Sequence, residues 1–176
     1  SKCKFTQDSD SKQITYLGGI VGGIEGSGKA VNITGCTFSG SITTKNTQYV
    51  GGIVGGAKET AAPITFTNCK NTGAIRGRCN IAGILGQANK TNANLTFKGC
   101  VNEGKIELYY DYTDGCAAGI AARIIGKAGN VIAFSDCENK GAVIYGSSSD
   151  FKNQTNVNGG RWMGGIAGYV YGGDGS

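Results

Sequence analysis

Alternating apolar and polar residues recur four times along the chain, each time just before a cysteine. The apolar residues stand five and three positions before the cysteine, as Val31/Ile33, Ile64/Phe66, Leu95/Phe97 and Ile132/Phe134. The residues between and after them are mostly polar. A period of two with one apolar face predicts a short, half-buried β-strand in each repeat. Because no helical period accompanies it, the pattern predicts an all-β fold.

A glycine motif precedes each of these strands at a nearly constant distance. The segment Leu17 to Gly22 reads Leu-Gly-Gly-Ile-Val-Gly, and related copies begin at Val50, Ile81, Ala117 and Met163. The second glycine of the motif falls at Gly19, Gly52, Gly83, Gly119 and Gly165, in steps of 33, 31, 36 and 46 residues. The first four of these glycines precede Cys36, Cys69, Cys100 and Cys137 by 17, 17, 17 and 18 residues. This constancy indicates a rigid half-repeat.

Further columns of equivalent residues follow each cysteine. Two, four and six positions after it stand Phe38/Asn71/Asn102/Asn139, Gly40/Gly73/Gly104/Gly141 and Ile42/Ile75/Ile106/Val143. A unit of about 33 residues fits one coil of a parallel β-solenoid, with like residues stacked about 4.8 Å apart. We therefore expect a parallel β-helix of about five coils, forming one domain over residues 1–176. A right-handed path is expected because parallel crossovers have that hand.

The columns also predict what fills the coils. Stacked asparagines are expected to form an amide ladder, and the glycines after them suit a turn with positive φ or a close backbone approach. The four repeat cysteines, with Cys3 before them, are expected to form one inward column of buried thiols. Cys79 and Cys116 lie outside this column and are the better candidates for a disulfide.

The order of these motifs resembles a known repeat. Gly-Gly-Ile-Val-Gly at Gly51 to Gly55, followed after a loop by Ile-Thr-Phe-Thr-Asn-Cys-Lys-Asn-Thr-Gly-Ala-Ile at Ile64 to Ile75, resembles the GLUG-type repeats of bacterial secreted and cell-surface proteins. The resemblance spans roughly Tyr16 to Tyr171. It implies an extracellular, adhesin-like solenoid that is part of a longer, surface-anchored repeat protein. It implies no catalytic residues, because the motif is structural.

Composition narrows the classes of function. The chain has 32 glycines, one proline and no histidine, so Ser-His triads and histidine metal sites are excluded. Without a C-x-x-C motif, zinc is not expected either, and we expect no cofactor. The net charge of +5 comes from scattered basic residues, which does not favour nucleic-acid binding. No apolar run is long enough to span a membrane.

One segment approaches a phosphate-binding loop. Gly23 to Ala30 matches G-x-x-x-x-G-K-[ST] at every position but the last, which is the magnesium ligand. Such a loop has to open a helix. Because Val31 to Cys36 is predicted as a strand, nucleotide binding is not expected.

Insertions between repeats mark a candidate binding edge. Extra residues gather at Leu108 to Gly115 and at Tyr145 to Arg161, and insertions leave a solenoid at its edge. Aromatic faces beside carboxylates suit a sugar ring or a partner protein. The candidate ligand-binding residues are Tyr109, Tyr110, Asp111, Tyr112, Asp114 and Trp162. Alternatively, these rings cover the core of a wider coil or cap its end.

The most favoured function is noncatalytic surface display or adhesion, with a glycan or a surface protein as partner. The alternative is a fragment of a polysaccharide hydrolase or lyase, since parallel β-helices host such enzymes. With only 12 acidic residues and no column of acids on the strands, catalysis is not expected. Ice binding by Thr34, Thr65, Thr67 and Thr96 is a third hypothesis, which Lys98 and Ala133 weaken by interrupting the array. Open coil ends also favour end-to-end self-association.

Overall fold

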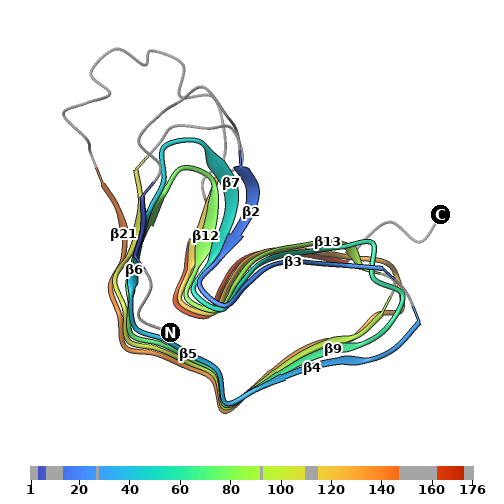
Figure 1. Cartoon of the computed structure of the whole chain (residues 1–176). Helices are drawn as coiled ribbons and strands as arrows, with labels where there is room; N and C mark the ends of the chain where they lie inside the picture. The colour runs from blue at the N-terminus through green and yellow to red at the C-terminus, as the bar shows by residue number, and fades with distance from the viewer. Residues whose placement is uncertain are drawn as a thin grey trace.

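The computed structural model describes residues 4–6, 14–26, 28–91, 93–109, 115–146 and 162–172. Every regular element in these residues is a β-strand, and the chain winds as a parallel β-solenoid of about four turns. Viewed along the axis, the windings superpose closely (Figure 1). The all-β parallel solenoid predicted from the repeats is confirmed.

The strands of successive windings form five parallel sheets, labelled A to E. Sheet A contains β1 (Lys4–Thr6), β6 (Ser41–Thr43), β11 (Ala74–Gly77), β16 (Ile106–Leu108) and β21 (Val143–Tyr145). Sheet B contains β2 (Ile14–Gly18), β7 (Thr47–Gly51), β12 (Asn80–Ala82), β17 (Cys116–Ala118) and β22 (Trp162–Gly164). Sheet C contains β3 (Val21–Glu25), β8 (Val54–Lys58), β13 (Leu85–Thr91), β18 (Ala121–Gly126) and β23 (Ala167–Gly172). Sheet D contains β4 (Val31–Thr34), β9 (Ile64–Thr67), β14 (Leu95–Lys98) and β19 (Ile132–Ser135). Sheet E contains β5 (Thr37–Phe38), β10 (Lys70–Asn71), β15 (Val101–Asn102) and β20 (Glu138–Asn139).

Within the described residues there are four complete windings, which begin at β2, β7, β12 and β17. Strand β1 precedes them, and β22 and β23 follow them. The expected number of about five coils counted glycine motifs, and the fifth motif contributes strands to sheets B and C alone within this part of the chain. None of the described residues forms a helix long and apolar enough to cross a membrane.

Stacked apolar side chains fill the interior in register. Phe66 pairs with Phe97, and Phe97 pairs with Phe134, across sheet D. Their ring centroids lie 4.8 Å apart at both steps, with interplanar angles of 5° and 4°. Phe66 and Phe97 are fully buried, which confirms the inward placement of these positions.

The predicted asparagine ladder runs beside this core on sheet E. Asn71 donates through Nδ2 to Oδ1 of Asn102 at 2.7 Å, and Asn102 donates in the same way to Asn139 at 2.7 Å. A Cβ on Gly83 would lie 2.4 Å from Oδ1 of Asn102, so glycine is required where the ladder meets the turn between sheets B and C. At Gly52, Gly83 and Gly119, both the ladder and the carbonyl oxygen of the equivalent glycine in the next winding leave no room for a Cβ.

The repeat cysteines also form a column. The thiols of Cys69, Cys100 and Cys137 donate to backbone carbonyls of the preceding winding, at 3.3, 3.6 and 3.5 Å. Cys69 and Cys100 are buried, while Cys36 and Cys137 at the two ends are half-buried. The column is confirmed for these four residues, and Cys3 lies outside the described residues. Cys79 and Cys116 are buried, and neither is in a disulfide with another described cysteine.

The outline of the solenoid turns back on itself where sheet B meets sheet C, between the strands labelled β12 and β13 in Figure 1. The chain backbones approach closely at this bend. A Cβ on Gly51 would lie 1.9 Å from the carbonyl oxygen of Val54, and one on Gly55 would lie 2.5 Å from the amide nitrogen of Leu17 in the preceding winding. We call this bend the re-entrant corner. Its glycines let the chain form it without steric overlap.

Candidate functional site

Two of the six predicted ligand-binding residues lie in the described part of the chain. Tyr109 is buried, and its hydroxyl donates to the backbone carbonyl of Thr44. The guanidinium of Arg76 covers its ring, 4.7 Å from the centroid. Because Tyr109 is buried and its hydroxyl is bonded within the chain, its ring is not open to a sugar from solvent. Tyr110, Asp111, Tyr112 and Asp114 lie outside the described residues.

Both insertions predicted to mark an edge connect sheet A to sheet B. One joins β16 to β17, and the other joins β21 to β22. They therefore leave neighbouring windings on the same side of the solenoid, as the intervals between repeats predicted.

The sixth residue, Trp162, belongs to a column on sheet B that faces the re-entrant corner. Residues at equivalent positions of the five strands are Tyr16, Tyr49, Asn80, Cys116 and Trp162. The facing column on sheet C contains Gly23, Gly56, Gln87, Arg123 and Tyr169, which pair in register. The two columns are seven residues apart in sequence within each winding, and they meet along the corner.

Side chains from the two columns contact one another across the corner. The ring of Tyr16 covers Gly56, whose Cβ would lie 2.3 Å from the ring. Asn80 donates through Nδ2 to Oε1 of Gln87 at 2.7 Å. Further along the axis, the rings of Trp162 and Tyr169 lie 4.9 Å apart at 53°. We call the set Tyr16, Tyr49, Asn80, Gln87, Arg123, Trp162 and Tyr169 the corner strip.

The corner strip is partly open to solvent. Its four aromatic rings and Arg123 are half-buried, while Asn80 and Gln87 are buried between them. Tyr16 and Tyr49 pack at 5.3 Å toward one end, and Tyr169 stacks at 6.4 Å on Tyr171, which is 38% exposed, at the other. Burial raises the pKa of Tyr49, and the positive charge of Arg123 opposes this. Such rings offer apolar faces and polar edges together.

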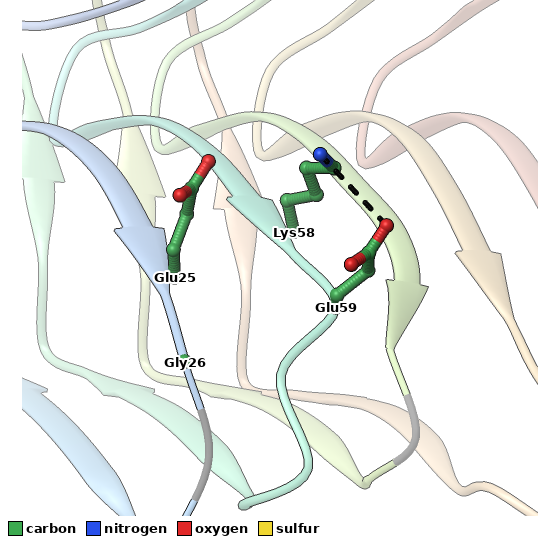
Figure 2. A pocket seen from close by; sticks show the side chains of 4 residues that line it. All are labelled: Glu25, Gly26, Lys58 and Glu59. Carbon is green, nitrogen blue, oxygen red and sulfur yellow. Dashed lines mark ion pairs between the residues drawn. The ribbon is translucent and has the colours of Figure 1, made fainter.

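A small charged pocket lies near the Tyr16 end of the corner strip, at the ends of β3 and β8. It measures about 180 Å³ and is lined by Glu25, Gly26, Lys58 and Glu59. Figure 2 shows the three charged side chains projecting from the same side of the sheet, and Nζ of Lys58 lies 3.8 Å from the Glu59 carboxylate. Burial raises the pKa of Tyr16, and the charges of Glu25 and Glu59 raise it further. This end of the strip is therefore acidic.

A second pocket of about 470 Å³ adjoins it and includes part of the loop that resembles a phosphate-binding motif. That loop leads directly into strand β4 and not into a helix. It therefore offers no helix N-terminus to a phosphate group, in agreement with the prediction from sequence. In the part of the chain that the structure describes, no three side chains of the metal-binding types are grouped to hold a metal ion.

The corner strip includes residues that the sequence analysis did not select. Tyr16 and Tyr49, like the selected Trp162, stand three positions before the second glycine of a motif, so the sequence contains a signal for them beside the glycine motif. Tyr169 stands four positions after such a glycine. The repeat alone does not show that these two positions face each other, because that depends on the direction in which the chain bends at the glycines.

Comparison with known proteins found no family model, no curated protein and no solved structure that matches this sequence. The resemblance to GLUG-type repeats therefore depends on the sequence motifs alone.

Proposed function

We propose that this chain is a noncatalytic, extracellular display or adhesion module that binds glycans through the corner strip. The observation that carries the proposal is the pair formed by Trp162 and Tyr169, two half-buried rings 4.9 Å apart beside polar side chains. Pyranose rings bind proteins through apolar C–H faces on aromatic rings and through hydrogen bonds to their hydroxyls. The pair and its neighbours have both kinds of group.

The length of the strip supports a polymeric ligand. Its residues come from four strands of sheet B and three strands of sheet C, and each winding advances the strip by about 4.8 Å. That advance is close to the length of one sugar unit in an extended chain. Successive windings therefore present side chains at a spacing that suits successive sugars of an oligosaccharide.

The experiment is a glycan array probed with the wild-type chain and with paired variants. Tyr49→Ala and Tyr169→Ala remove rings of the corner strip, and each is expected to weaken binding about fivefold or more, since a lost ring contact costs about 1 kcal/mol or more. Tyr110→Ala and Tyr112→Ala alter the inserted edge segment and serve as matched aromatic controls. These controls are expected to bind as the wild type does.

The opposite result would assign binding to the edge. If the two edge variants lose binding and the two strip variants keep it, the corner strip is not the site. If the wild-type chain binds no glycan on the array, the proposal of glycan binding is wrong. Circular dichroism of each variant shows that the fold is retained.

The alternative of a polysaccharide-active protein has one observation in its favour. Glu25 and Glu59 line a common pocket near Tyr16, and glycosidases act through paired carboxylates. Lys58 forms an ion pair with Glu59. This pair favours a role for the Glu59 carboxylate in stabilising charge. Release of reducing sugars from polysaccharides by the wild-type chain, lost in Glu25→Gln, would support the enzymatic function over the proposed one.

A further inference from the structure

Arg123 lies toward the Trp162 end of the corner strip and forms no ion pair with the acidic residues that the structure describes. It lies on β18, in register between Gln87 and Tyr169. Its guanidinium is 5.6 Å from the centroid of the Tyr169 ring, and the Trp162 ring lies 4.9 Å from the same ring. The arginine therefore adjoins the aromatic surface that the proposed function assigns to sugar rings.

The charge of Arg123 is not neutralised within the described part of the chain. The ion pairs formed there involve Lys58, Lys70, Arg76, Lys105 and Lys140 as the bases. The Nε of Arg123 is covered by protein and donates no hydrogen bond to the described residues. The terminal amino groups of the guanidinium remain as donors for a ligand.

Arg76 is the comparison within the same solenoid, since its Nε is likewise buried without a hydrogen bond but its guanidinium forms an ion pair. Its guanidinium also covers a tyrosine ring, that of Tyr109 at 4.7 Å. Its Nε, however, lies 3.2 Å from the carboxylate of Glu107 on the next strand of sheet A. The position next to Arg123 on the following strand is occupied by Tyr169 and not by an acid. The two arginines thus differ in the presence of a carboxylate.

The two glutamates near the Tyr16 end of the corner strip lie too far along the axis to form an ion pair with Arg123. Glu25 and Glu59 accompany β3 and β8, whereas Arg123 is on β18, two windings beyond β8. In the windings around Arg123, the neighbouring positions of the strip are Gln87, Trp162 and Tyr169, all uncharged. The strip is therefore acidic at one end and basic near the other.

We infer that the glycan bound in the corner strip carries a carboxylate, as uronic and sialic acids do, and that this carboxylate pairs with Arg123. The inference rests on the proposed glycan binding. A half-buried guanidinium gains most from an anion that replaces lost water contacts, and its planar donors match a carboxylate in two parallel hydrogen bonds. A carboxylated sugar can place its ring on Trp162 and Tyr169 while its acid group reaches the guanidinium.

The test uses an array in which carboxylated oligosaccharides are printed beside their own methyl esters. Esterification removes the charge and keeps the sugar ring, so each pair isolates the carboxylate. Sulfated and neutral oligosaccharides form the remaining arms. The wild-type chain is expected to bind the acids about tenfold more tightly than the esters, since a hydrogen bond to a charged group is worth about 1.5–3 kcal/mol.

Variants assign this preference to Arg123. Arg123→Gln is expected to bind acid and ester equally. Arg123→Lys keeps the charge but loses the planar pair of donors, so part of the preference is expected to remain. Arg76→Gln is the matched control and is expected to keep the full preference. Thermal unfolding of the variants separates a binding effect from a loss of fold.

The possible outcomes distinguish failure of this inference from failure of the proposed glycan binding. Equal wild-type binding of acids and esters, or tighter binding of sulfated sugars, would overturn the inference while leaving glycan binding in place. A preference that persists in Arg123→Gln would also overturn it. Absence of binding on every arm would remove the proposed function and this inference together.

Discussion

At the scale of the residue, each interior side chain stacks on its own equivalent in the next winding. Phe97 is fully buried between Phe66 and Phe134, with ring centroids 4.8 Å away on both sides. Because its neighbours are held by their own stacks, the space of a missing ring is not readily refilled. The core therefore depends on side chains that match along the axis.

Replacing Phe97 by alanine is accordingly expected to destabilise the chain by about 3–5 kcal/mol. Urea unfolding followed by circular dichroism measures the change. Val131→Ala is the control, because Val131 is 56% exposed and its loss is expected to stay within about 0.5 kcal/mol. An unchanged midpoint for Phe97→Ala would contradict the inward stack.

The column of thiols predicts the order in which its cysteines react with an alkylating reagent. Only the thiolate is alkylated, and burial raises the pKa of the Cys36 thiol, so less thiolate forms at pH 8 than in a free cysteine. The hydrogen bond with Cys69 and burial both raise the pKa of Cys100. Peptide mapping after iodoacetamide treatment is expected to show Cys36 and Cys137 modified first, and Cys69 and Cys100 only after unfolding. Equal rates at all four positions would show that the column is open.

At the scale of the element, the turns of each winding have two distinct causes. The residue just before each column cysteine has a positive φ, and these residues are Gly35, Asn68, Gly99 and Asp136, at 63°, 51°, 61° and 53°. Glycine, asparagine and aspartate tolerate this region best. For the glycines four residues after the cysteine, the sequence predicts either a positive φ or a close backbone approach. The structure shows close approach, since a Cβ on Gly104 would lie 2.0 Å from the carbonyl oxygen of Gly73.

Close approach at the re-entrant corner depends on the presence of a preceding winding. A Cβ on Gly55 would lie 2.5 Å from the carbonyl oxygen of Gly22. Gly22 holds the same position of the motif in the first complete winding, and its Cβ would meet only the Tyr16 carbonyl oxygen, at 3.7 Å. There is therefore room for a Cβ at this position of the motif in the first complete winding, but not in the second.

Gly55→Ala is expected to cost at least about 2 kcal/mol, because backbone on both sides would have to move. Gly22→Ala is expected to be neutral or slightly stabilising, because alanine reduces the entropy of the unfolded chain. Denaturant midpoints of the two variants, measured side by side, check this difference. If both variants were equally stable, the corner would not be tightly packed.

At the scale of the whole molecule, burial is graded along the axis. Strand β8 is almost wholly buried, whereas β3 before it is mostly exposed, and β19 near the other end is less buried than β9 and β14. In a solenoid each winding is stabilised by its neighbours, so windings at the ends have fewer contacts. The predicted end-to-end self-association of such windings stays a prediction.

Hydrogen exchange is expected to follow this gradient. Amides of β8, β9, β13 and β14 are expected to exchange at least about tenfold more slowly than those of β3, β4 and β23, since local opening is easier at the ends. Exchange followed by mass spectrometry resolves the windings. Uniform protection along the axis would indicate that all windings open together.

Sequence alone determined the strands, the repeat length and the columns of phenylalanine, asparagine and cysteine. It did so because in-register stacking turns a period along the chain directly into a column in space. Tertiary structure alone decided that Trp162 meets Tyr169 and that, among the described residues, no carboxylate pairs with Arg123. The direction of the bend at the glycines depends on backbone packing against neighbouring windings, and the repeat period contains no information about that direction.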